Sequence, residues 1–416
     1  MSALVAVTRS RRRALDPALV WAALAVGLSF AFVWGWSWAV HANDYALEAA
    51  APMTALLHGH FGTFFSSAPS YGPSLLLRAP FALPGSLAGG TALLVYRLGA
   101  LPCLLALAGL GVWLARTMRR AGGSLVGGTL ALALCAANPI TYRALTLGHP
   151  EEMLGAALCT GAVLLAIRGR PLWAGLALGV AIANKQWALL AIGPVFIALP
   201  HGRWRALLLA GAVAGALEAP MLLSLPSLTT DTTRIVVSDT GAIFHPQQIF
   251  WFLGSRIHLT ASMLGVVAHG MRQAPPWLGG RAHLLIVWLG LPATWLAVRR
   301  RTRSEEALLL LAMLLLLRCW LDPWNVVYYP LPFIVALAAW ETTVALRAPL
   351  LAIFATAATW LDFQYLPDRL SPDSLALSFL VPATLALIAL ALALYRPRVP
   401  RSTLGAALSR RRAAPS

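Results

Sequence analysis

The chain has 416 residues, of which 59% are hydrophobic and only 11% are charged. A water-soluble protein of this length carries about twice that share of charged residues. The composition therefore excludes a cytosolic globular protein and a disordered chain, and it indicates an integral membrane protein. The formal net charge of +17 suggests nucleic acid at first, but the positions of the charges along the chain argue against it.

Long uncharged runs recur along the whole chain, and a run of about 20 apolar residues is enough to cross a bilayer core. They predict an all-α polytopic membrane protein of roughly twelve transmembrane helices. Some runs are short, so the pair within residues 172–199 also fits broken or re-entrant helices. The first run, residues 17–40, follows an arginine cluster and reads as a signal anchor rather than a cleaved signal peptide, because it is long and more spans follow.

The basic residues predict the orientation of the chain. Arginines cluster before the first run, in alternate short loops and in the tail, so both termini are expected in the cytoplasm. Residues 1–16 then form a basic N-terminus, residues 17–395 a single transmembrane domain, and residues 396–416 a basic tail. This charge suits anionic lipid headgroups and not nucleic acid. A chain rich in Arg, Ala and Leu points to a bacterial genome and hence to a bacterial plasma membrane.

Two segments on the non-cytoplasmic side, about 41–89 and 226–282, are too long to be simple turns. Function is therefore expected on the outer face, at the boundary of lipid and water. In the first segment Asn43 is placed to cap a short helix that Pro52 limits. Residues 74–83 resemble an apolar interfacial helix interrupted by Pro80.

The chain lacks the familiar motifs of soluble enzymes. It has no nucleotide-binding glycine loop, no zinc-protease motif and no nucleophile elbow. The four cysteines lack metal-like or redox-like spacing and read as small buried side chains. No cofactor and no metal is expected; a metal site at His149 and the two following glutamates is disfavoured because no further ligand has suitable spacing.

Ionisable residues at membrane depth are expensive, by about 2.5–3.5 kcal/mol each, so each one is a candidate functional residue. Those near the predicted outer ends of the runs are expected to converge on one external site. They are Asp44 with Glu48, then Arg143 with His149, Glu151 and Glu152, then Lys185, and finally Arg318 with Asp322.

Each of these groups also has a purely structural interpretation, which the sequence leaves open. The alternatives are a helix dipole for Asp44 and Glu48, a helix start for Glu151 and Glu152, snorkelling for Lys185, an ion pair for Arg318 and Asp322, and an aromatic belt for Trp320 and Trp324. Lys185 is unusual as the only lysine in a chain that otherwise uses arginine.

Short motifs within roughly residues 40–345 resemble glycosyltransferase family 87, of the GT-C class of membrane glycosyltransferases. They are Asn43-Asp44-Tyr45, Asn138-Pro139, Leu147-Gly148-His149-Pro150-Glu151-Glu152, Gly175–Gly179 before Lys185-Gln186-Trp187, and Leu321-Asp322-Pro323-Trp324-Asn325 with Tyr328-Tyr329. Many family members have Gly-Gln-x-Asn and Lys-Pro where this chain has His-Pro-Glu-Glu and Lys-Gln-Trp.

The resemblance implies a GT-C-like fold and the transfer of a sugar, typically mannose, from a polyprenyl-phosphate donor. The acceptor would be a glycolipid, a glycan or a protein on the outer face. An inverting single displacement needs one base and cations around the departing phosphate, whereas a hydrolase needs two opposed carboxylates. Asp44 matches the family's motif at the position expected for the base.

The other candidates fall into two groups. Lys185 is expected to contact the donor phosphate, with Arg143, His149, His245 and His258 completing a cationic pocket. Residues expected to bind the acceptor or support the base are Glu48, Glu151, Glu152, Arg318, Asp322 and Trp324.

Two other functions stay open at this point. A transporter or flippase of polyprenol-linked substrates would also carry charges at depth, but it usually shows internal repeats and polar groups near the midplane. The second of these functions is that of a structural or assembly subunit without catalysis.

Overall fold

The computed structural model describes residues 17–36, 43–224, 243–256, 271–278 and 281–396. These residues are predominantly helical, which confirms the all-α membrane fold. Six segments of the described chain are long and apolar enough to cross a membrane; the count of roughly twelve spans stays a prediction. The six are α1 (Pro17–Trp36), α5 (Ala92–Arg120), α6 with α7 (Leu125–Ala136 and Pro139–Leu147), α11 (Arg203–Ser224), α13 (Ala282–Arg299) and α17 (Pro372–Tyr395).

Shorter apolar helices lie between these six. They are α8 (Glu151–Ile167), α9 (Pro171–Asn184), η3 (Gln186–Ala191) with α10 (Ile192–Ala198), α14 (Ala307–Leu321) after the short turn η5 (Ser304–Glu306), α15 (Leu331–Thr343), and α16 (Leu350–Trp360) with η6 (Leu361–Tyr365). Nearly every residue of α8, α14 and α15 is buried, and therefore these helices are apolar all round and show no amphipathic stripe. The four cysteines are buried and unbonded, as predicted.

The apolar stretch that includes α9 and α10 is broken at Lys185. α9 ends at Asn184, Lys185 has an extended backbone with φ −157° and ψ 127°, and the 3₁₀-helix η3 follows. The sequence left open whether this stretch is broken, and the structure shows the break at the chain's only lysine. Irregular backbone at membrane depth is tolerated where it is buried in protein or lines a cavity.

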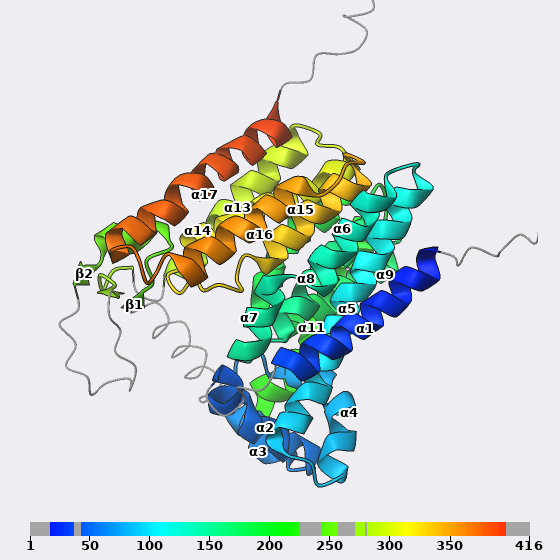
Figure 1. Ribbon diagram of the computed structural model, residues 1–416, viewed down its shortest axis with the longest axis vertical. Coiled ribbons are helices and arrows are strands. Elements are labelled where there is room, and N and C mark those ends of the chain that lie inside the picture. The colour runs from blue at the N-terminus through cyan, green and yellow to red at the C-terminus, as the bar shows by residue number, and fades with distance from the viewer. Residues whose placement is uncertain (1–16, 37–42, 225–242, 257–270, 279–280, 397–416) are drawn as a thin grey trace, which may run out of the picture.

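The segment after α1 is helical where the structure describes it. It contains η2 (Tyr45–Ala49), α2 (Ala50–Leu57), α3 (Phe61–Ser67) and α4 (Gly72–Leu87), and Figure 1 shows α2, α3 and α4 gathered at one end of the bundle. Asn43 caps this segment as predicted, because its Oδ1 accepts the Ala46 N–H at 3.2 Å.

Two proline predictions in this segment were wrong. Pro52 lies in the first turn of α2, which follows directly on the π-helix η2, and the helix continues past it to Leu57. Pro80 does not interrupt α4, which runs through both Pro80 and Pro84 and packs along α5. Tertiary packing of α4 outweighs the lost backbone hydrogen bonds.

The segment before α13 is described over residues 243–256 and 271–278. β1 (Ile243–Phe244), β2 (Ser255–Arg256) and β3 (Arg272–Gln273) form a small antiparallel sheet with β3 in the middle, and η4 (Ile249–Leu253) lies between β1 and β2. The His245 N–H donates to the Pro323 carbonyl at 3.0 Å, and Arg272 pairs with Asp373 at 2.7 Å. These bonds hold the sheet against the ends of α14 and α17.

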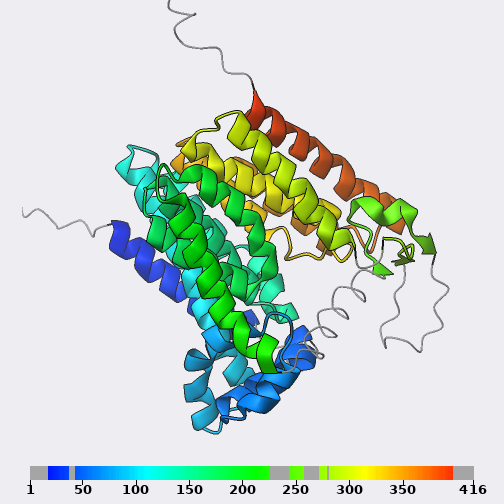
Figure 2. The same cartoon turned by 180° about the vertical axis from the view of Figure 1, so that it is seen from behind.

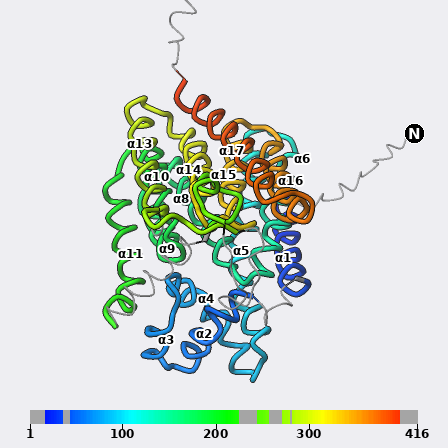
Figure 3. Tube along the Cα trace, turned by 90° about the vertical axis from the view of Figure 1, so that its left-hand side faces the viewer, coloured from blue at the N-terminus to red at the C-terminus, as the bar shows by residue number. Residues whose placement is uncertain are grey.

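Helix α9 packs against α11 through two glycines four residues apart. A Cβ atom at Gly179 would lie 2.7 Å from the Ala210 carbonyl oxygen, and one at Gly175 would overlap the Ala206 carbonyl. Small residues at this spacing let membrane helices approach closely. Figures 2 and 3 show α11 along one side of the bundle, with α13 beside it and α1 on the opposite side.

Candidate functional site

Glu151 is the centre of a buried ion-pair cluster at the N-terminal end of α8. Its side chain is 0% exposed, and its Oε1 lies 2.7 Å from His149 Nδ1 and 3.3 Å from Lys185 Nζ. Its Oε2 lies 3.6 Å from Arg78 Nη1, which α4 brings to the cluster. A buried carboxylate of this kind requires partners, because an unpaired charge there would cost several kcal/mol.

Glu152 extends the cluster to α14. Its carboxylate lies 3.6 Å from Lys185 Nζ and 3.7 Å from Arg318 Nη1. The guanidinium of Arg318 also lies 4.2 Å from the ring centre of Tyr329 and 5.0 Å from that of Trp187. The start of α8, the break after α9 and the end of α14 therefore meet at one place.

Asp44 joins this cluster through His149. The Nε2 of His149 donates to Asp44 Oδ2 at 2.9 Å while its Nδ1 donates to Glu151. The side chain of Asp44 is 43% exposed, against 0% for Glu151. Of Asp44, Glu151 and Glu152, Asp44 is thus the carboxylate that a hydroxyl group in solution or in a bound ligand reaches most readily.

His149 is protonated at neutral pH. Burial disfavours its charged form, but the charge of Glu151 and the hydrogen bonds to Asp44 and Glu151 outweigh this and raise its pKa to about 9. Its ring also lies 4.8 Å from the ring of Tyr328. An imidazolium that donates from both nitrogens holds Asp44 in a fixed orientation.

Glu48 reaches the cluster by another route. It accepts a hydrogen bond from the Tyr71 hydroxyl at 2.7 Å, and the Tyr71 ring centre lies 4.2 Å from Lys185 Nζ. Tyr71 therefore links Glu48 to Lys185. Unlike Asp44, Glu48 does not bond to His149.

The cluster is rich in cations. The four cations Arg78, His149, Lys185 and Arg318 surround the three carboxylates Asp44, Glu151 and Glu152. In addition, the buried Trp187 Nε1 and Arg318 Nη1 have no hydrogen-bond partner. Such groups suit an anionic ligand, because each N–H can donate to one of its oxygens.

A cavity of about 370 Å³ opens beside these groups, and we call it the cationic cavity. Lys185, Trp187 and Arg318 line it together with His283 and Asp322, whose side chains lie 3.5 Å apart. Arg318 and Asp322 are thus paired with other partners, Glu152 and His283, and not with each other as the structural interpretation expected.

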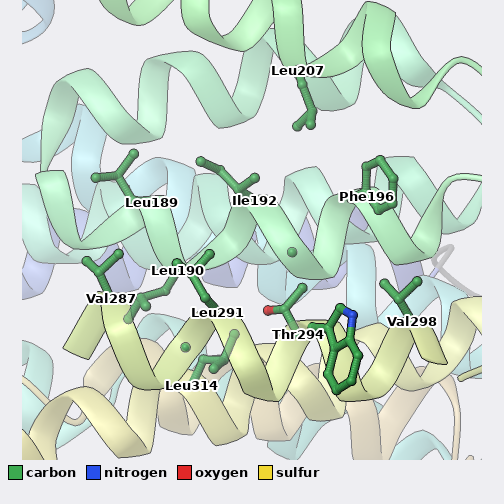
Figure 4. Close-up of a pocket in the computed structure, with 13 residues that line it drawn as sticks. Leu189, Leu190, Ile192, Phe196, Leu207, Val287, Leu291, Thr294, Val298 and Leu314 are labelled. Atoms are coloured by element: carbon green, nitrogen blue, oxygen red, sulfur yellow. The ribbon is translucent and has the colours of Figure 1, made fainter. Parts of the chain in front are cut away.

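An apolar groove of about 450 Å³ between η3–α10, α11 and α13 adjoins the cationic cavity. Leu189, Leu190 and Val287 line both spaces. Figure 4 shows side chains of all three segments directed into this groove, among them Leu207 of α11 and Leu291 of α13.

A sequence profile of glycosyltransferase family 87 matches residues 70–321, which is more than half of the chain. The chain belongs to glycosyltransferase family 87. None of the curated proteins compared with it matches. The protein is therefore a glycosyltransferase, and the transporter alternative receives no support. The matched residues include His149, Glu151 and Lys185, whereas Asp44 and Asp322 lie outside them.

Two residues predicted for the cationic pocket of this glycosyltransferase, Arg143 and His245, are not part of its described ion-pair cluster. Arg143 contacts the Thr146 hydroxyl at 3.4 Å and does not appear among the described ion pairs of the cluster. His245 packs against Trp324 with ring centres 4.4 Å apart, and burial lowers its pKa to about 4, so it is neutral. His258 lies outside the described residues.

The sequence interpretation missed several residues at the glycosyltransferase's site. Arg78 is 1% exposed and comes from the stretch that was interpreted as an interfacial helix. A lone arginine in an apolar run was a signal, because a charge in such a place needs a partner. The hydroxyl of Tyr71 and the ring of His283 carried no comparable signal, since neither residue type is unusual near a membrane surface.

Proposed function

We propose that this glycosyltransferase moves mannose from a polyprenyl-phosphate donor to an acceptor hydroxyl on the outer face of the bacterial plasma membrane. The reaction is an inverting single displacement. The observation that carries this proposal is that the cationic cavity and the apolar groove adjoin, since Leu189, Leu190 and Val287 line both. Together they fit one ligand with an anionic head and a long apolar tail.

The cationic cavity supports binding of the phosphate. Lys185 acts as a point charge, and Arg318 and Trp187 supply N–H donors from the same wall. Cations and donors placed where negative charge develops stabilise the departing phosphate, and they are most effective in a site shielded from water. Glu151 and Glu152, being buried, hold these cations in place.

The apolar groove supports binding of the polyprenyl tail. Leu291 and Val298 of α13 line the far part of the groove, and Leu291 is 61% exposed. A residue this apolar and this exposed on a membrane helix faces lipid. The tail can therefore enter sideways from the bilayer while the phosphate reaches Lys185.

Asp44 is the proposed base. It takes the proton of the acceptor hydroxyl as that oxygen attacks the anomeric carbon, and the bond from this carbon to the phosphate oxygen breaks. The electron pair leaves with the phosphate, so the products are the glycosylated acceptor and polyprenyl phosphate. One carboxylate suffices because phosphate needs no acid to leave. The exposure of Asp44 and its bond to His149 support this role.

The distribution of arginines supports an outward-facing site. Arg119 and Arg120 end α5 and Arg299 ends α13. At the opposite ends, Tyr96 of α5 donates to the Leu145 carbonyl just before His149, and His283 of α13 lines the cationic cavity. By the positive-inside rule the arginine-rich ends face the cytoplasm, and both termini lie there too.

The donor proposal is tested with the purified full-length protein in nanodiscs and with polyprenyl phosphate as the ligand. We expect Lys185→Met to weaken binding at least about tenfold, because a charge-assisted bond to phosphate is lost. Arg369→Met removes an equal charge from an exposed position away from the cavity and should leave binding unchanged. Equal affinities in the Lys185→Met variant and the parent would show that Lys185 does not bind phosphate.

A further inference from the structure

A second cavity, of about 310 Å³, lies between the ends of α7, α16 and α17 and the segment that contains β1. Its polar lining comes from His245, Gln247 and Gln364, and its apolar lining includes Phe363 and Val327. It differs from the cationic cavity in that its lining contains no lysine, arginine or carboxylate among the described residues.

Residues near His149, which bonds to the proposed base, line both cavities. Leu147 lines the second cavity two residues before His149, and Val327 lines it next to Tyr328, whose ring lies 4.8 Å from His149. Lys185 lines the cationic cavity and pairs with Glu151, which in turn bonds to His149. Each cavity is thus linked to His149, and His149 bonds to Asp44.

Several polar atoms at the second cavity lack hydrogen-bond partners although they are buried. One is His245 Nε2, which belongs to the lining. Two more belong to neighbours of Gln247. Asn325 donates to the Gln247 carbonyl at 2.7 Å but leaves its own Oδ1 unpaired. Asp362 has its carboxyl within hydrogen-bonding reach of the Gln247 side chain but leaves its Oδ2 unpaired.

The chemistry of this lining selects one class of ligand. Imidazole and amide groups donate to and accept from hydroxyl groups, and the Phe363 ring offers an apolar face. Burial keeps His245 neutral, so the cavity offers a phosphate no cation, and the nearby carboxyl of Asp362 would repel one. A sugar ring has both the hydroxyl groups and the apolar C–H face that these walls require.

We propose that the second cavity binds a neutral sugar residue of the acceptor and presents its hydroxyl to Asp44. The acceptor is thereby a glycan or a glycolipid and not a bare lipid phosphate. This inference rests on the proposed function, in which the cationic cavity holds the donor.

The direct test is photo-crosslinking with an octyl α-mannoside that carries a diazirine in its aglycone. The full-length protein is placed in nanodiscs free of glycolipids and sugar detergents, and labelled peptides are mapped by mass spectrometry. We expect labels within residues 243–256 and 361–375, which excess octyl α-mannoside displaces and excess octyl phosphate does not. Labels confined to other segments, displacement by octyl phosphate alone, or no displaceable label would overturn the inference.

Matched variants separate this site from the donor site. Gln364→Leu should reduce the displaceable label at least about fivefold and leave polyprenyl phosphate binding unchanged, since a hydrogen-bonding amide is lost only from the second cavity. Gln273→Leu makes the same change at an exposed position and should label like the parent. Full labelling of Gln364→Leu would contradict the inference. If the parent binds the mannoside in this cavity but fails to bind polyprenyl phosphate, the donor proposal fails and the sugar site stands.

Discussion

Individual residues at the site differ in exposure more than in chemical type. Asp44 and Glu151 are both carboxylates that bond to His149, yet one is 43% exposed and the other 0%. Sequence reasoning brought Asp44, Lys185 and the glutamates into one group because charges near membrane spans are costly. It could not assign their partners, because pairing such as that of Glu151 with Arg78 depends on how α4 packs against α5 and α9.

The pKa of His149 predicts an alkaline limit for the enzyme. Because it is raised from 6.5 to about 9, protonated His149 stabilises the fold fully below pH 6.5, and this contribution is lost as the pH rises through about 9. We expect both transfer and the thermal unfolding midpoint to fall between about pH 8 and 10. His149→Asn should lack this decline of the midpoint; the same alkaline decline in that variant would assign it to another group.

Removal of the Glu151 charge should destabilise the protein. Glu151→Gln leaves Arg78, His149 and Lys185 without their shared carboxylate, which for a buried pair costs about 3–5 kcal/mol. Thermal unfolding of the purified variant measures the effect. Glu305→Gln, at an exposed position in η5, is the matched control and should unfold like the parent. Equal midpoints for all three proteins would mean that Glu151 does not organise the cluster.

At the scale of elements, helix ends and breaks position the site. The break at Lys185 places that side chain beside the first turn of α8, and the end of α14 places Arg318 there as well. Apolar run lengths predicted where most helices lie, and the start of α8 at the two glutamates followed from the preceding proline. The path of α4 through Pro80 could not be predicted, because it depends on how α4 packs against other helices, α5 above all, and not on the residues of its own turn.

The close contact between α9 and α11 is expected to hold Lys185 in register. Gly179→Leu would force a side chain against the Ala210 carbonyl, so the two helices must separate. We expect a lower unfolding midpoint and weaker polyprenyl phosphate binding. Gly211→Leu, on α11 at a position where a Cβ atom meets nothing within 4 Å, should behave like the parent. If Gly179→Leu is as stable as Gly211→Leu, this contact does not support the site.

At the scale of the whole molecule, the two ends of the helix bundle differ. One end is rich in arginine, and the other holds the site. Composition and hydropathy predicted the membrane fold, since these averages do not depend on tertiary contacts. They could not predict that residues 45–87 fold into a layer of helices at one end of the bundle, nor that a small sheet holds His245 against Trp324. Both depend on contacts between distant segments.

The orientation of the molecule is tested by labelling single cysteines in intact cells. In a variant without the four buried native cysteines, Gly62→Cys in α3 should react with a membrane-impermeant thiol reagent. Ala121→Cys, after the arginine-rich end of α5, should not react. Ala121 is the better choice than Gly122, whose φ of +80° would strain a cysteine. The reverse labelling pattern would place the site in the cytoplasm and contradict the outward-facing account.

The most direct test of the account is the transfer of labelled mannose from polyprenyl-phosphate-mannose to octyl α-mannoside by purified Asp44→Asn. This variant is nearly isosteric with the parent but cannot accept the hydroxyl proton. We predict that transfer falls by about 10²–10⁴-fold while polyprenyl phosphate still binds. Asp368→Asn makes the same change at an exposed position and should transfer at the parent's rate. Transfer by Asp44→Asn at the parent's rate would contradict the account.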